Sequence, residues 1–378
     1  MEFETLCLHA DNNKKDEWGT LTMPVCQSAT FVHKGVGVQS DYSYSRLSNP
    51  TRAHLENTVA RLEGGAAAVA FSSGMAAITT VMKLFKQKAH IIASEDLYGG
   101  SLRLFRNVNT VEGMSFDFVD TCDIACVKSL INENTKAIYC ETPSNPLMQV
   151  SDVAQLASLA HKNGLLLIVD NTFLTPYFQR PLDLGADIVI HSGTKYLGGH
   201  NDTLAGFAVA KTPELAEKIV YYAKTIGACL APWDSFLIER GIKTLPLRMD
   251  RINANAKIIA EWLRGRKEVK KVYYTGFEDH AGYKVTKKQA SGFGGMVSFE
   301  VESKALAENV LKNIKVFQYA ESLGGVESLI TYPMLQTHAD VPVDERERRG
   351  INDRILRISV GIENVKDLIE DLEQAFKA

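Results

Sequence analysis

The stretch Leu165-Leu-Leu-Ile-Val-Asp-Asn-Thr172 indicates the fold class. Its apolar run, 165–169, is far too short to cross a membrane and is typical of a strand buried on both faces of a sheet. Segment 153–163 before it has helical periodicity, with Ser151 as the predicted N-cap and Gly164 just past the predicted end. A helix followed at once by a buried strand predicts an α/β unit.

The same alternation of helical segments and short apolar runs covers most of the first 210 residues. A helix predicted over 53–63 ends at Gly64, and the runs that follow leave room for a helix between most of them. The runs lie at 66–71, 89–93, 115–119, 137–140, 165–169, 187–190 and 204–210. They predict a mainly parallel seven-stranded sheet with helices on both faces.

The pattern changes after about residue 240. Segments 295–301 and 355–360 have the pattern of strands, and 364–378 that of an amphipathic helix. With 378 residues the chain is long for a single core, so two domains are expected. We predict an N-terminal arm over 1–45, a large domain over 46–240 and a smaller α+β domain over 241–378.

Composition excludes several classes of function. The net charge of −3 gives no basic surface for nucleic acid. The acidic start, residues 1–5, lacks the basic and apolar regions of a signal peptide, so we expect a cytoplasmic protein with no membrane association. The histidines do not cluster at the spacing of metal ligands, and we expect no metal site.

Polar residues follow five of the predicted strands. In open α/β sheets, ligands bind beyond the carboxyl ends of the strands, so these residues should meet at one rim. The polar segments are 72–75, 96–100, 141–146, 170–172 and 191–195. Together they carry a lysine, an aspartate, an aromatic ring and an anion cradle, which is the set that a pyridoxal 5′-phosphate (PLP) site needs.

Two of these residues carry most of this interpretation. Lys195 follows a buried strand and two hydroxyl residues, Ser192 and Thr194; it would form an imine while they orient a phosphate. The alternative is an ordinary surface lysine. Asp170 ends a buried strand, where its carboxylate needs a partner such as a pyridinium N–H. Its alternative is an aspartate that caps a turn.

Three further features each have two interpretations. The N–H groups of segment 72–75, with Gly74 allowing close approach, suit a phosphate, or they form a plain strand–helix turn. Tyr98 either stacks on a flat cofactor or is a half-buried tyrosine. Arg357 interrupts an apolar strand and binds either a substrate carboxylate or an internal acidic residue.

Eight motifs, in order along nearly the whole chain, resemble those of a known family. They are 44–52 (YSRLSNPTR), 71–77 (FSSGMAA), 96–101 (DLYGGS), 141–146 (ETPSNP), 169–172 (VDNT), 191–200 (HSGTKYLGGH), 321–328 (ESLGGVES) and 356–361 (LRISVG). The chain resembles the Cys/Met-metabolism PLP enzymes, the transsulfuration branch of fold type I. Within that family it is most similar to the cystathionine γ-synthase/O-acetylhomoserine thiolyase type.

The resemblance implies roles around the cofactor. Lys195 is then the Schiff-base lysine, Asp170 the partner of the pyridine nitrogen, and Tyr98 the stacking ring and a proton shuttle. Gly74, Met75, Ser192 and Thr194 hold the phosphate, which Tyr44 and Arg46 of a neighbouring subunit also reach. The family therefore implies an obligate dimer, and usually a homotetramer.

The resemblance also bears on the substrate and the reaction. Arg357, with Asn145 and Ser322, binds the α-carboxylate of an amino-acid substrate. Gly100 stands where methionine γ-lyases usually carry cysteine. Glu321 is a glutamate at a position where a glutamate resembles the γ-specific members of the family. Ser43, however, stands where several γ-enzymes carry an acidic residue.

Three functions remain possible on the sequence alone. The first is γ-replacement on O-acyl-L-homoserine, with cysteine or with sulfide. The second is a cystathionine γ- or β-lyase. The third is a non-catalytic binding protein that has lost the cofactor.

Overall fold

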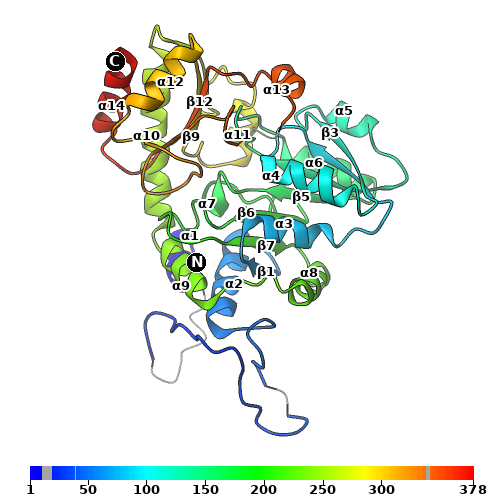
Figure 1. Cartoon of the computed structure of the whole chain (residues 1–378). Helices are drawn as coiled ribbons and strands as arrows, with labels where there is room; N and C mark the ends of the chain where they lie inside the picture. Colours follow the sequence, from blue (N-terminus) through cyan, green and yellow to red (C-terminus); the bar gives the residue numbers. More distant parts are fainter. Residues whose placement is uncertain (11–18, 39, 338–340) are drawn as a thin grey trace.

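The computed structural model describes residues 1–10, 19–38, 40–337 and 341–378 and contains two sheets (Figure 1). The larger sheet has the strand order β1-β7-β6-β5-β4-β2-β3. Its strands are β1 (Ala67–Phe71), β2 (His90–Ser94), β3 (Ser115–Val119), β4 (Thr135–Glu141), β5 (Leu166–Asp170), β6 (Ile188–Ser192) and β7 (Gly206–Ala210). All seven match apolar runs of the sequence.

Most neighbours in this sheet run parallel, as predicted. Strand β7 is the exception, because it pairs antiparallel with both β1 and β6. Alternate residues of β5 enter opposite cores: Leu167 and Val169 join one cluster, and Ile168 joins the other. The helices that cover the two faces include α2 (Pro50–Glu63), α3 (Gly74–Met82), α6 (Val153–Lys162) and α8 (Pro213–Ile226).

The smaller sheet comes from the last third of the chain, in the order β10-β11-β12-β9-β8. Its strands are β8 (Val269–Tyr273), β9 (Met296–Val301), β10 (Gln318–Tyr319), β11 (Leu329–Thr331) and β12 (Ile355–Ser359). Helices α10 (Leu245–Arg264), α12 (Lys304–Asn313) and α14 (Val365–Lys377) lie close to it in Figure 1. This mixture agrees with the predicted α+β character, while the exact domain bounds stay predictions.

Shorter helices connect these parts. They are α1 (Phe3–His9), α4 (Gly99–Leu104), the π-helix η1 (Phe105–Asn109), α5 (Ile124–Ser129), α7 (Thr175–Phe178), α9 (Pro232–Ile242), α11 (Tyr283–Gln289) and α13 (Val343–Arg349). Among the described residues, no helix is both long enough and apolar enough to span a membrane.

Capping explains two differences from the prediction, the start of α2 and the cap residue of α6. Helix α2 begins at Pro50, since the Asn49 side chain accepts hydrogen bonds from the N–H groups of the first turn. The prediction of Ser151 as the N-cap of α6 is wrong. Asp152 is the cap, and its side chain accepts from the N–H of Gln155.

The arm is only partly extended. Residues 3–9 form helix α1, which packs Phe3, Leu6 and Cys7 against the core of the large sheet. Residues 11–18 and 39 of the predicted arm lie outside the described residues. The blue segment before α2 projects away from the body of the molecule in Figure 1, and Val32 on it is 94% exposed.

Candidate active site

A cavity of about 350 Å³ lies at the carboxyl ends of the parallel strands, facing the smaller sheet. Every predicted site residue except Tyr44 and Arg46 lines it. These are Gly74, Met75, Tyr98, Asn145, Asp170, Ser192, Thr194, Lys195, Glu321, Ser322 and Arg357. The rule that ligands bind beyond the strand ends therefore predicts the position of this cavity.

Lys195 points into this cavity and is not a surface lysine. Its Nζ donates a hydrogen bond of 2.6 Å to the Oγ of Ser322. Burial lowers the pKa of Lys195 to about 8, with a further lowering by the charge of Arg357 and an opposing effect of Glu321. An amine that is partly deprotonated near neutral pH can act as a nucleophile and as a base.

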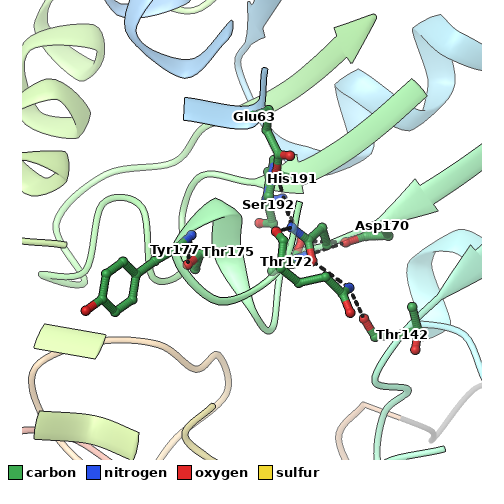
Figure 2. Close-up of polar contacts among 10 residues, drawn as sticks. Glu63, Thr142, Asp170, Thr172, Thr175, Tyr177, His191 and Ser192 are labelled. Atoms are coloured by element: carbon green, nitrogen blue, oxygen red, sulfur yellow. Dashed lines mark hydrogen bonds and ion pairs between the residues drawn. The ribbon is translucent and has the colours of Figure 1, made fainter. Parts of the chain in front are cut away.

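Asp170 ends β5 at the wall of the cavity, and Figure 2 shows its link to Thr172. Its Oδ1 accepts from the N–H of Thr172 at 3.0 Å and from the Thr172 hydroxyl at 2.6 Å. Asp170 thus forms a turn and faces the cavity as well. Burial raises the pKa of its carboxyl, while these two hydrogen bonds and the charge of His191 oppose the rise.

The turn after β1 forms the start of helix α3 and the proposed phosphate cradle. Ser73 is the N-cap, and its Oγ accepts from the N–H of Ala76. The N–H groups of Gly74 and Met75 therefore fall in the first turn, where no acceptor exists within the helix. A Cβ on Gly74 would lie 3.1 Å from the Cβ of Ser192, so glycine keeps this corner open.

Arg357 is buried on β12, with 1% of its surface exposed, and reaches the cavity from the smaller sheet. Its Nη1 donates to Asn145 Oδ1 at 2.7 Å, and its Nη2 to the carbonyl of Ser322 and the hydroxyl of Thr331. Within the described ranges no carboxylate pairs with it. The salt-bridge interpretation is therefore wrong, and a cation without a carboxylate partner remains at the cavity wall.

Tyr98 lies at the mouth of the cavity and is 45% exposed. A Cβ on Gly100 would lie 2.5 Å from its ring, so this ring position requires glycine at 100. The backbone N–H of Tyr98 donates to Glu141 Oε2 at 3.0 Å. Burial and the charge of Asp170 raise the pKa of Glu141 well above its usual range.

Sequence reasoning gave no role to Glu141, although it ends β4 as Asp170 ends β5 and pairs with it in register. The strand-end rule places its segment, 141–146, at the same rim as Asp170, but gives Glu141 no individual role. Thr172, from the predicted rim segment 170–172, also lines the cavity, as do Phe173, Leu204 and Thr337, for which no site role was predicted. Of these, Thr337 comes from a connecting segment of the second half and carried no detectable signal.

Tyr44 and Arg46 do not line the cavity of their own chain. Arg46 donates to the carbonyl of Lys224 at 2.6 Å and lies over the Tyr44 ring at 5.6 Å. The described part of the chain holds no group of three or more side chains that suits a metal ion.

Comparisons with known proteins agree with this geometry. A cystathionine β-lyase of Lactococcus lactis subsp. cremoris (strain MG1363) is 46% identical, covering 99% of this chain and 98% of its own. A cystathionine γ-synthase/O-acetylhomoserine (thiol)-lyase of Bacillus subtilis (strain 168) is 48% identical, with 98% and 95% covered. The crystal structure of a cystathionine γ-lyase from Lactobacillus plantarum, complexed with L-serine, superposes with a TM-score of 0.97 at 46% identity, covering 100% and 99%.

The family model described as "Cys/Met metabolism PLP-dependent enzyme" matches residues 4–377. A match of this length includes both sheets and every residue of the cavity. The chain therefore belongs to the family of PLP-dependent enzymes of cysteine and methionine metabolism.

Proposed function

We propose that this enzyme catalyses γ-replacement on an O-acyl-L-homoserine, with cysteine to form cystathionine or with sulfide to form homocysteine. The observation that carries the proposal is the placement of Glu321 and Ser322 beside Lys195 in the cavity. Chemistry at Cγ requires protons to leave both Cα and Cβ. One amine can handle both protons only if it gains and loses a proton readily at working pH.

The side chains fit the cofactor that the family uses. Gly74 leaves room for a phosphate at the start of α3, Lys195 offers a reactive amine, and Asp170 offers a carboxylate for a ring N–H. Bound there, PLP supplies an electron sink for the charge left on the substrate carbon.

Lys195 is the proposed proton carrier. The Ser322 hydroxyl accepts a hydrogen bond from Nζ and so fixes the position of the amine. Glu321 favours its charged form, whereas burial and Arg357 favour its neutral form. These opposing influences support an amine that takes a proton from one carbon and returns it to another.

Arg357 is the proposed anchor for the α-carboxylate of the substrate. Its guanidinium is fixed by Asn145, Ser322 and Thr331 before any ligand arrives. A rigid cation orients a carboxylate with little loss of entropy, which places the substrate Cα near Lys195.

The proposed assembly is supported by the two predicted site residues that do not line the cavity. We propose that Tyr44 and Arg46 complete the phosphate site of a neighbouring subunit, in a homotetramer built from two active dimers. The projecting arm and its exposed Val32 support this arrangement. The fold type I assignment, the bounds 1–45, 46–240 and 241–378, and a cytoplasmic location belong to the same proposal.

A cystathionine γ- or β-lyase is the second candidate, because relatives at 46% identity carry those names. Product analysis with O-acetylhomoserine, O-succinylhomoserine and cystathionine in parallel separates the two candidates. We expect cystathionine or homocysteine from an acylhomoserine supplied with cysteine or sulfide. Turnover of cystathionine alone, with no product from either acylhomoserine, would replace the proposal with the lyase.

A further inference from the structure

A buried pair of a histidine and a glutamate lies behind the cavity, on the side of β6 that faces α2. His191, on β6, places its Nε2 2.5 Å from Glu63 Oε1, at the end of α2. The two side chains are 1% and 0% exposed. Figure 2 shows the dashed line between them, with Ser192 and Thr172 following toward Asp170.

This pair is held in place by further buried polar groups. The amide of Asn171 donates to Glu63 Oε1 at 3.2 Å and to the carbonyl of Gln179 at 2.7 Å. The amide of Gln179 in turn donates to Thr142 O and Asn171 Oδ1. Such a network fixes the imidazole of His191 relative to the ends of β4 and β5.

The strand ends present two carboxylates side by side, and their charges compete. Asp170 and Glu141 are register partners on β5 and β4, and the charge of Asp170 raises the pKa of Glu141. The pKa of Tyr139, also on β4, is raised mainly by burial and further by the charges of both carboxylates. Two adjacent buried carboxylates are costly to ionise together, so their other neighbours decide which one is charged.

These neighbours differ for the two carboxylates. Asp170 has the hydroxyl and N–H of Thr172 and, from β6, the charge of His191. Glu141 has the N–H of Tyr98 and the charge of Arg357, which lower its pKa, but the nearby charge of Asp96 raises it. The hydrogen bond to Glu63 fixes the position of the His191 imidazole, whose charge acts on Asp170.

We propose that Glu63 and His191 are positioning residues that make Asp170, rather than Glu141, the anionic carboxylate at the strand ends. Glu63 fixes the position of the His191 imidazole, the charge of His191 favours the ionised form of Asp170, and Asp170 then offers a full charge to the ring N–H of the cofactor. This inference rests on the proposed role of Asp170, but not on which reaction the enzyme catalyses.

The test measures the affinity of the full-length apoprotein for PLP at pH 6 and pH 8. Without the charge of His191, Asp170 takes up a proton more easily, so binding weakens as the pH falls. For His191→Asn we expect the ratio of the Kd at pH 6 to the Kd at pH 8 to exceed the wild-type ratio by about tenfold, the effect of a shift of about one pKa unit. Glu63→Gln, which keeps size and hydrogen bonding, should shift the ratio in the same direction.

The chain offers a matched control in a second pair of a histidine and a buried glutamate. His54, also on α2, lies 3.3 Å from Glu239 on α9. Glu239→Gln should leave the ratio of the two Kd values at its wild-type value. Equal weakening at both pH values in the Glu63 and His191 variants would show a purely structural role and overturn the inference.

Two features keep the test decisive. If His191→Asn does not fold, Glu63→Gln alone decides, because an unchanged ratio in that variant is enough to reject the inference. Since no substrate is present, the outcome is independent of the products that test the γ-replacement proposal.

Discussion

At the scale of single residues, the candidate site depends on charges that are shifted by their surroundings. Lys195 is drawn toward its neutral form by burial and toward its charged form by Glu321. Arg357 remains a cation although burial lowers its pKa to about 10. A base with a lowered pKa next to a fixed cation is what the proposed chemistry requires, since the cation binds the carboxylate and the base removes the proton.

The first prediction concerns Lys195→Ala. We expect the rate of product formation to fall by about 10²- to 10⁴-fold, the usual contribution of a positioned acid–base group. PLP should still bind through the phosphate cradle, but without a covalent link to the chain. Steady-state kinetics measure the first effect, and borohydride reduction followed by mass spectrometry measures the second. Cofactor fixed to another lysine of the wild-type chain would contradict the assignment.

The second prediction concerns the pH dependence of cofactor uptake by the apoprotein. Only the neutral amine of Lys195 attacks an aldehyde, so the uptake rate should rise with pH through about 8 and then level off. Glu321→Gln removes a charge that raises the pKa of Lys195, and the midpoint should therefore move to lower pH. Stopped-flow absorbance measures the midpoint.

Glu327→Gln is the control for this shift. Glu327 hydrogen-bonds Asn201 and does not line the cavity, so its removal should leave the midpoint in place. A midpoint that stays at the wild-type value or rises in Glu321→Gln would contradict the electrostatic role of Glu321.

At the scale of helices and strands, periodicity predicted the parts that are buried on both faces. All strands of the large sheet were predicted because each is an apolar run. Strand β8 was missed because the two lysines in Val-Lys-Lys-Val-Tyr, 269–273, leave it half exposed. Strands β10 and β11 were missed because they have only two and three residues and gain their stability from neighbouring strands.

Local sequence pattern also predicted part of the candidate site. Residues that follow strands, such as Asp170 and Lys195, were found from local pattern alone. The hydrogen bonds of Arg357 could not be predicted from local pattern, because its partners Asn145 and Ser322 come from distant parts of the chain. The Glu63–His191 pair likewise joins residues 128 positions apart, and no local pattern predicts such a contact.

The third prediction concerns the contact between strand β7 and helix α3. A Cβ on Gly206 would lie 2.0 Å from the carbonyl oxygen of Ser73 and 2.7 Å from the N of Gly74. Gly206→Ala should therefore displace the start of α3, lowering the free energy of unfolding by about 1–3 kcal/mol and weakening PLP binding. Chemical denaturation and cofactor titration measure the two effects.

Gly265→Ala is the matched control for this contact. Its Cβ would have its nearest neighbour at 3.5 Å, which is ordinary contact, so both measurements should stay near wild type. If Gly206→Ala bound PLP with wild-type affinity, the start of α3 would not be the phosphate cradle.

At the scale of the whole molecule, two of the predicted site residues lie outside the cavity that holds the others. The cavity contains the lysine, the aspartate and the arginine, whereas Tyr44 and Arg46 lie at the end of the predicted arm and just after it. Large apolar side chains stay exposed on the arm and on α8 and α9, among them Val32, Tyr221 and Trp233. Exposed apolar patches mark interaction sites, so these residues agree with the proposed assembly.

The last prediction tests whether neighbouring subunits share a site. If Arg46 serves the partner subunit, then Arg46→Ala and Lys195→Ala each inactivate both sites of a homodimer. In a mixed dimer, the chain with Arg46→Ala keeps its Lys195 and receives Arg46 from the other chain, so one of the two sites is intact. Co-refolding equal amounts of the two inactive variants should therefore restore about one quarter of wild-type activity, because about half of the dimers are mixed. Activity that stays at the level of the separate variants, although mass spectrometry detects mixed dimers, would show that Arg46 acts within its own chain.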